Sequence, residues 1–339
     1  MKPSVPLLAA AFAATILPAA SALDQVKTTE RMVAGTITSV TALAVKVEQN
    51  NQVRELPANQ IEYVSYEGEP NVLKTARSNV STGRYEDALA ALADLDTATI
   101  KRPEVVQDVE FYKAYSLAQM ALVGNGDIAE AGSKMFAFVK AHPTSFHYFE
   151  AQLLVGQLAM ALGNANAAAN VYKLVGQNAP WPDYKARAAV ALGRSHLAQN
   201  QIDEASAAFQ AALEIQDASA AVQQAKLAAT LGQARCLAAT GQIDQASTMI
   251  EDVIKQADPE DSRLLAEAYN ALGAAYRSAG KPKEALLAFL HVDLIYFSSA
   301  QEHIEALYNL VELWNERQMP ERSAEAARTL RERYKRSPR

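Results

Sequence analysis

The sequence predicts a mainly α-helical protein, with an array of about seven helix pairs behind a small β domain. Three observations support this fold class. A two-helix pattern, clearest at residues 265–297, recurs from about residue 70 onward, whereas residues 31–69 hold short runs of β-branched and aromatic residues. Half of the chain is hydrophobic and aromatic residues are few, as in ordinary alanine-rich helical proteins. Stacked helix pairs would bury a continuous core that no single pair could bury alone.

The first 22 residues have the features of a secretory signal peptide. Lys2 precedes an apolar run at residues 5–17, and residues 20–22, Ala-Ser-Ala, form a small-residue cleavage site. The alternative is a retained membrane anchor, but the run is shorter than the ~20 residues that span a bilayer. The residue directly after the cleavage point is not a cysteine, which argues against a lipoprotein. We therefore predict cleavage after residue 22 and a periplasmic or otherwise exported protein.

Residues 23–69 are predicted to form the small β domain. Leu43, Val45 and Val47 alternate with other residues, which predicts a strand with one buried face. Residues 49–52, Gln-Asn-Asn-Gln, predict a hairpin turn, because asparagine tolerates the left-handed backbone of such turns.

Two further strands are predicted at residues 53–56 and 61–66, with a short turn at 57–60 between them and a bulge at Gly35. This order resembles SH3-like or Sm-like small barrels. An SH3-like domain would imply binding of cell-wall peptides and an Sm-like domain would imply binding of RNA. The aromatic and basic clusters that either needs are missing, so we prefer a structural cap over the first repeat.

Seven turn residues mark the helix pairs: Gly83, Gly126, Gly163, Asn200, Gly241, Gly280 and Gln318. A small residue follows five positions after each turn: Ala88, Ala131, Ala168, Ala205, Ala246, Ala285 and Ser323. Glycine or asparagine suits the turn because a helix commonly ends with a left-handed residue. The small residue lets the two helices of one pair approach closely.

Residues 265–297 resemble the tetratricopeptide repeat. The residues that carry the resemblance are Gly273, Tyr276, Gly280, Ala285 and Phe289. The resemblance implies a right-handed α-solenoid over residues 70–337 that works as a binding scaffold. Successive turn residues lie 37 to 43 positions apart, which is longer than the usual repeat of about 34 residues.

The resemblance also implies a concave groove, which the first helix of each repeat lines. By register, the groove residues are Arg187, Arg194, Arg235, Asn270, Arg277, Tyr308, Glu312 and Asn315. Four arginines on one wall would bind an anionic peptide through bidentate pairing with carboxylates. The family's Lys-Asn pairing is not reproduced, and the alternative is that these arginines are solvated or paired within the chain.

Several loop residues have predicted roles. Pro143 and Pro180 are expected to end the second and third repeats, and Asp183 to cap the next helix. Trp181 is expected to pack into the array rather than to contact a partner.

The sequence offers no catalytic or metal-binding motif. It contains no HExxH, CxxC, GxSxG or phosphate-binding loop, and its five histidines have no metal-ligand spacing. His196 is read as a packing residue and Cys236, the only cysteine, as a buried apolar residue. We therefore predict no enzymatic activity, no cofactor, no metal and no small-molecule substrate.

The charge excludes one class of partner. With 32 basic against 38 acidic residues and a net charge of -6, the chain lacks the basic excess of nucleic-acid-binding domains. The segment from Arg317 onward is basic, which either complements a helix dipole or contacts anionic lipid or envelope polymer.

The preferred function is a non-enzymatic exported scaffold that binds a protein or extended peptide in the cell envelope through its groove. The alternative is a cell-wall or glycan-binding accessory protein whose β domain makes the recognition.

Overall fold

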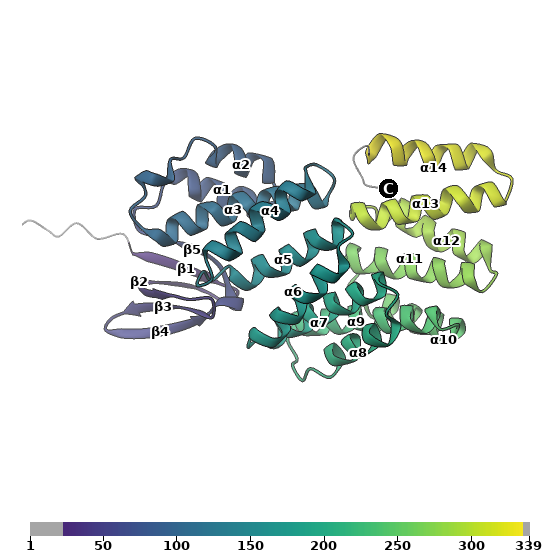
Figure 1. The fold of residues 1–339 in the computed structure, drawn as a ribbon, viewed down its shortest axis with the longest axis horizontal. Helices are drawn as coiled ribbons and strands as arrows, with labels where there is room; N and C mark the ends of the chain where they lie inside the picture. Colours follow the sequence, from purple (N-terminus) through teal and green to yellow (C-terminus); the bar gives the residue numbers. More distant parts are fainter. Residues whose placement is uncertain (1–22, 335–339) are drawn as a thin grey trace, which may run out of the picture.

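The computed structural model describes residues 23–334 (Figure 1). The predicted signal peptide and the basic residues Lys335, Arg336 and Arg339 lie outside the described residues. The described part contains five strands followed by fourteen α-helices, which confirms the mainly α fold with seven helix pairs. No helix between residues 23 and 334 is long and apolar enough to cross a bilayer.

The strands are β1 (Asp24–Thr28), β2 (Met32–Val40), β3 (Ala44–Gln49), β4 (Gln52–Pro57) and β5 (Ile61–Ser65). The first eight helices are α1 (Asn71–Ser81), α2 (Tyr85–Leu92), α3 (Pro103–Leu122), α4 (Ile128–Ala141), α5 (Tyr148–Ala161), α6 (Ala165–Asn178), α7 (Pro182–Ala198) and α8 (Ile202–Leu213). The remaining helices are α9 (Ala220–Ala239), α10 (Ile243–Gln256), α11 (Ser262–Ser278), α12 (Pro282–Leu294), α13 (Ala300–Glu316) and α14 (Pro320–Arg333).

The strands form one antiparallel sheet in the order β4-β3-β2-β1-β5. The predicted hairpin turn joins β3 to β4, and Asn50 and Asn51 have positive φ values of 52° and 58°. This pair of left-handed residues matches the twist of the two strands. The predicted turn at residues 57–60 is a short 3-10 helix, Ala58–Gln60.

Three details of the β domain differ from the prediction. Strand β1 was missed. Leu43 precedes β3 and is 49% exposed, whereas Ala44 and Val45 are both buried, so the alternation does not begin at Leu43. Gly35 is not a bulge, because the irregular register of β2 lies between Ile37 and Ser39. A Cβ on Gly35 would lie 2.4 Å from the backbone oxygen of Glu48, so glycine there permits a close approach of two strands.

The helix pairs follow the predicted register. Six of the seven turn residues have positive φ: Gly83, Gly163, Asn200, Gly241, Gly280 and Gln318. In the second pair the left-handed residue is Gly124 instead of Gly126. All seven small residues five positions after the predicted turns are at most 5% exposed, because the paired helices meet there.

A second kind of contact between neighbouring helices joins a glycine to an aromatic ring. An added Cβ on Gly156 would lie 2.4 Å from the ring of Tyr172, and one on Gly273 would lie 2.7 Å from the ring of Phe289. Phe209 lies between two such glycines, Gly193 on α7 and Gly232 on α9. The rings therefore occupy the space that a side chain on the facing helix would need.

The odd-numbered helices form one continuous row. Each of them from α1 to α11 contacts the next odd-numbered helix as well as its own partner helix. Figure 1 shows the resulting curved array, with the sheet beside its first half. This row is the wall on which the candidate site lies.

The β domain docks along the edge of the array instead of covering only the first repeat. Asp24 on β1 accepts hydrogen bonds of 2.7 and 3.0 Å from Arg102, the residue before α3. Asn59 donates to Asp183 at the start of α7 over 3.1 Å. The domain thus bridges several helix pairs at their N-terminal ends. The predicted cap at Asp183 is wrong, because α7 begins at Pro182 and Trp181 precedes it.

A buried ionic network reinforces this junction. Arg77 on α1 donates to both carboxylate oxygens of Glu69 at 3.0 Å and lies 3.4 Å from Asp108 on α3. His147, beside α5, lies 3.2 Å from the other oxygen of Asp108 and stacks on Phe111 at 3.6 Å. Paired buried charges of this kind favour one arrangement of the groups around them.

Candidate functional site

A groove of about 270 Å³ lies on the row of odd-numbered helices. Its lining comes from α5, α7, α9 and α11, with Tyr172 contributed by α6. The apolar lining residues are Leu153, Val190, Ala191, Ala221, Ala225, Ala228 and Leu264. The polar lining residues are Gln157, Arg187, Arg194, Gln224, Asp261, Arg263 and Glu267.

The predicted groove residue Arg187 is paired within the chain. Its guanidinium lies 2.9 Å from Glu150 on α5, and the hydroxyl of Tyr184 donates to the same carboxylate over 3.2 Å. The pair joins α7 to α5. The positive charge of Arg187 is thus largely neutralised before any partner arrives.

Arg194 and Arg235 converge on one buried carboxylate, that of Glu267 on α11. Arg194 lies 2.6 Å from it and Arg235 lies 3.9 Å from it, while Arg235 also donates to the backbone oxygen of Glu267. Burial opposes the charge of Glu267, yet the guanidinium groups of Arg194, Arg235 and Arg263 hold its pKa below the ordinary value. Glu267 therefore remains ionised and ties α7 and α9 to α11.

Asn270 is fully buried and contacts α13. Its side-chain nitrogen donates to the backbone oxygen of Glu302 at 2.9 Å and to its carboxylate at 3.0 Å. Burial, with the nearby charge of Glu267, raises the pKa of Glu302 to about 6. Asn270 thus stabilises the contact between helices and is unavailable to a partner.

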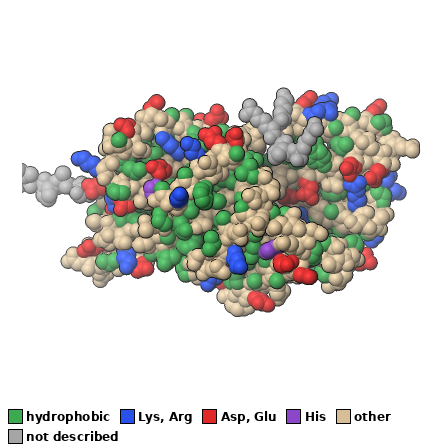
Figure 2. Space-filling view, in the orientation of Figure 1, with side chains coloured by type: hydrophobic (Ala, Val, Ile, Leu, Met, Phe, Trp, Pro, Cys, Tyr) green, Lys and Arg blue, Asp and Glu red, His purple; other side chains and the backbone are tan. Residues whose placement is uncertain are grey.

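The last predicted residues lie on α11 and α13, beyond the lining of the groove. Arg277 is 2.6 Å from Glu312 and 2.8 Å from Glu316. Tyr308 and Asn315 are exposed on α13. In the view of Figure 2, acidic side chains gather in the hollow between the first half of the array and α11–α14. This part of the wall would not attract an anionic peptide.

The structure therefore brings Arg187 and Arg194 to the groove and gives each of the four predicted arginines a carboxylate partner. The sequence prediction missed Arg263 and Glu267. Glu267 stands six residues before Gly273, as Arg187 stands before Gly193, so the same register contained this signal. Arg263 is exposed on the first turn of α11 and makes no ion pair with any residue between 23 and 334.

Other predictions concern the packing. Cys236 is buried, and burial raises its thiol pKa, in keeping with its predicted apolar role. Trp181 packs against Phe149 with 5.6 Å between ring centroids, as expected. No group of His, Cys, Asp and Glu suited to a metal ion occurs among residues 23–334. His196 is only partly buried and lines a separate pocket.

The stacked helix pairs, together with a groove on their inner row, define a helical-repeat scaffold of the kind that contacts other proteins. Residues 186–219, which cover most of α7 and all of α8, match the family model of the tetratricopeptide repeat. The chain therefore carries a tetratricopeptide repeat, and its array has the fold that the sequence resemblance predicted.

One solved structure supports the same fold, and two others have lower similarity. A tetratricopeptide repeat protein from Parabacteroides merdae ATCC 43184 is 17% identical, with a TM-score of 0.55 over 79% of this chain and 97% of that chain. The apo form of RapI is 11% identical over 79% of this chain and 77% of its own, with a TM-score of 0.46.

A tetratricopeptide repeat protein from Thermus thermophilus is 15% identical over 71% of this chain and 98% of its own, with a TM-score of 0.29. The similarity to the Parabacteroides merdae protein supports the solenoid architecture. A comparison with curated proteins found no match.

Proposed function

We propose that this protein is a non-enzymatic exported scaffold that binds an extended segment of a partner protein in the groove between α5, α7, α9 and α11. The observation that carries the proposal is the lining of that groove, in which apolar residues lie beside Arg263, an exposed cation that makes no ion pair with any residue between 23 and 334. Tetratricopeptide-repeat arrays offer such surfaces to protein and peptide partners.

The apolar lining determines which side chain the groove accepts. Alanines on α9 face Leu153, Val190 and Leu264 across about 270 Å³, enough for an aliphatic or aromatic side chain of the partner. Burying such a side chain contributes about 1.5–3 kcal/mol. The apolar lining therefore favours a partner segment with one apolar anchor residue.

Arg263 determines the charge that suits the segment. The other arginines of the groove already contact Glu150 or Glu267, whereas the guanidinium of Arg263 is exposed and has five donors to offer. A carboxylate next to the apolar anchor would pair with it. The proposed partner segment is therefore apolar with an adjacent acidic residue, and it is not a broadly anionic peptide.

The proposed compartment is the cell envelope. It rests on the sequence features of residues 1–22. The basic segment from Arg317 onward would add a peripheral contact with anionic envelope components.

The test is recovery of the partner from native envelopes after chemical crosslinking, with mass-spectrometric identification. Ala221→Trp places an indole in the groove from an exposed position of α9, and Gln223→Trp places the same ring outside the groove on the same helix. Arg263→Glu reverses a charge that makes no ion pair with any residue between 23 and 334, and Lys283→Glu makes the same charge reversal on the exposed first turn of α12, outside the groove.

We expect Ala221→Trp and Arg263→Glu each to reduce partner recovery about tenfold or more. A tenfold loss of affinity corresponds to about 1.4 kcal/mol of binding free energy. The two control variants should retain the wild-type recovery. Equal recovery from groove and control variants would refute the proposal.

A further inference from the structure

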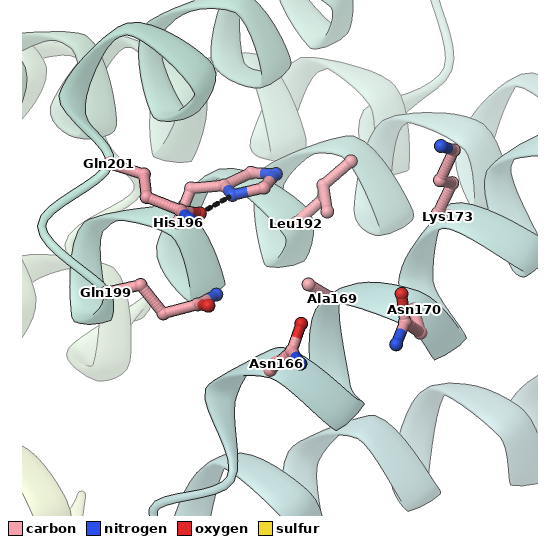
Figure 3. Close-up of a pocket in the computed structure, with 8 residues that line it drawn as sticks. All are labelled: Asn166, Ala169, Asn170, Lys173, Leu192, His196, Gln199 and Gln201. Carbon is pink, nitrogen blue, oxygen red and sulfur yellow. Dashed lines mark hydrogen bonds between the residues drawn. The ribbon is translucent and has the colours of Figure 1, made fainter.

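A second cavity, of about 340 Å³, lies between α6 and α7 (Figure 3). Asn166, Ala169 and Asn170 form one side, and Leu192 and His196 form the other. Gln199 and Gln201 stand at one end and Lys173 at the other. The lining contains four amide side chains, one imidazole and one ammonium group, and no carboxylate.

Most of these polar groups have spare hydrogen-bonding capacity. His196 Nδ1 donates to the amide oxygen of Gln201 over 2.6 Å (Figure 3), which leaves the amide nitrogen of Gln201 free to donate. The side-chain nitrogen of Gln199 donates to the backbone oxygen of Ser195. Among the described residues, the side chains of Asn166 and Asn170 have no hydrogen-bond partner within the protein.

The repeat register explains why this cavity is open. His196 stands four residues before the turn residue Asn200, as Tyr276 stands four residues before Gly280. The hydroxyl of Tyr276 reaches across from α11 and donates to Glu251 on α10 over 2.8 Å. The shorter His196 turns to Gln201 instead, so the corresponding space between α6 and α7 is left open.

The spacing of the amides suits a polypeptide backbone. Asn166 and Asn170 are four residues apart on one helix, which separates them by about 6.0 Å along the axis. In an extended chain the backbone groups that face one way repeat every two residues, or about 6.6–6.8 Å. Each amide offers donors and an acceptor, as does each peptide unit, so two amides in this row can each meet one backbone unit of an extended segment.

We propose that the cavity between α6 and α7 binds an extended polypeptide through its backbone, with Lys173 at one end for a carbonyl or carboxylate of that segment. A saccharide is the competing ligand for a polar cavity, but the lining has no tryptophan, tyrosine or phenylalanine ring on which a sugar face could stack. The lack of a carboxylate in the lining disfavours a cationic ligand.

This site is independent of the groove in the proposed function. Leu192 and His196 lie on the opposite side of α7 from Val190 and Arg194, which line the groove. One site can therefore be blocked without disturbing the other.

The experiment uses the mature chain and an array of immobilised 12-residue peptides of random sequence. Any bound peptide is then titrated in solution by fluorescence anisotropy. One variant combines Asn166→Ala with Asn170→Ala, and both changes favour the helix. A second variant, His196→Tyr, fills the cavity as Tyr276 fills its counterpart. The control is Gln177→Ala, which removes an exposed amide from α6 outside the cavity.

We expect both cavity variants to weaken binding at least tenfold. The double variant loses two amide contacts, each contributing up to roughly a factor of ten, and the tyrosine of His196→Tyr occupies the space of the ligand. Gln177→Ala and Ala221→Trp should bind like the wild type. Methylation of alternate backbone nitrogens of the peptide should weaken binding by a similar factor, which recognition of side chains alone would not produce.

Three outcomes would overturn the proposal. The array could yield no peptide whose binding responds to the cavity variants. Ala221→Trp could abolish the same binding, which would assign it to the groove. Soluble N-acetylglucosamine oligomers, tested in the same titration, could bind the wild type and lose affinity in the cavity variants, which would assign the cavity to saccharides.

Discussion

Replacing Gly232 with alanine tests the packing between the fourth and fifth helix pairs, because Gly232 lies on α9 and the ring of Phe209 lies on α8. A Cβ at this position would lie 2.4 Å from two ring carbons of Phe209. The ring is fully buried and also lies close to Gly193 on α7, where an added Cβ would come within 2.6 Å of it. The added methyl group must therefore displace a helix.

Two effects of opposite sign set the magnitude. Overpacking a core costs about 1–3 kcal/mol, while alanine in a helix interior gains about 1 kcal/mol over glycine. We expect Gly232→Ala to lower the free energy of unfolding by up to about 2 kcal/mol. Gly176→Ala on α6 should instead raise it by up to about 1 kcal/mol, because the nearest atom to its added Cβ lies at 3.8 Å.

Urea unfolding followed by circular dichroism at 222 nm measures both changes. Phe209→Leu in the Gly232→Ala background makes room for the methyl group, so the double variant should lose less than the sum of the single losses. If Gly232→Ala and Gly176→Ala changed stability in the same direction, or if the losses were additive, the ring would not be what excludes a side chain at Gly232.

Three other predictions concern buried charge. The folded chain holds Glu302 with a pKa of about 6, above the ordinary value of 4.5, so its contribution to the free energy of unfolding should fall as pH rises from about 4.5 to about 6. Glu302→Gln keeps an acceptor for Asn270 but cannot titrate. In urea unfolding at a series of pH values, this variant should lack about 2 kcal/mol of the decline that the wild type shows. Arg77→Met leaves the Glu69 and Asp108 carboxylates without their shared cation and should lower the free energy of unfolding by about 3–5 kcal/mol. Thermal unfolding measures this loss, and a loss below about 1 kcal/mol would contradict a stabilising role of the ionic network. Arg194→Met should cost less, about 1–2 kcal/mol, because Arg235 remains near Glu267, and Glu267→Gln in the same chain should restore part of the loss.

The sequence predicted the repeat array well because its determinants are local. A small residue five positions after a turn identifies a helix contact whatever the rest of the chain does, and all seven proved buried. The prediction of a turn at Gly126 was wrong because two glycines lie close together in the sequence. Only the fold determines that Gly124 takes the left-handed backbone.

The β domain was harder because strand pairing is not local. Nothing near β1 shows that it lies between β2 and β5. The role of Gly35 likewise depends on an approach to Glu48 across the sheet, which has no counterpart in adjacent residues. Docking of the domain beside α3 and α7 depends on contacts such as Asn59 with Asp183, which are 124 residues apart.

The candidate site was likewise predictable only in part from the sequence. Register placed Arg187 and Arg194 on the inner row, but it could not show that Glu150 and Glu267 would neutralise them from neighbouring helices. Residue type and spacing specify where a side chain lies, whereas its charge partner depends on how successive repeats stack.

Attachment of the β domain along the edge has a mechanical consequence. Its hydrogen bonds to the residue before α3 and to the first turn of α7 hold these two helices in fixed relative positions. Across the groove, α11 is joined to α7 by the ion pair between Arg194 and Glu267. A ligand that moves α11 away from α7 would therefore strain that bridge and displace the C-terminal helices. We expect α3 and α7 to stay in place while α11 and the helices after it move.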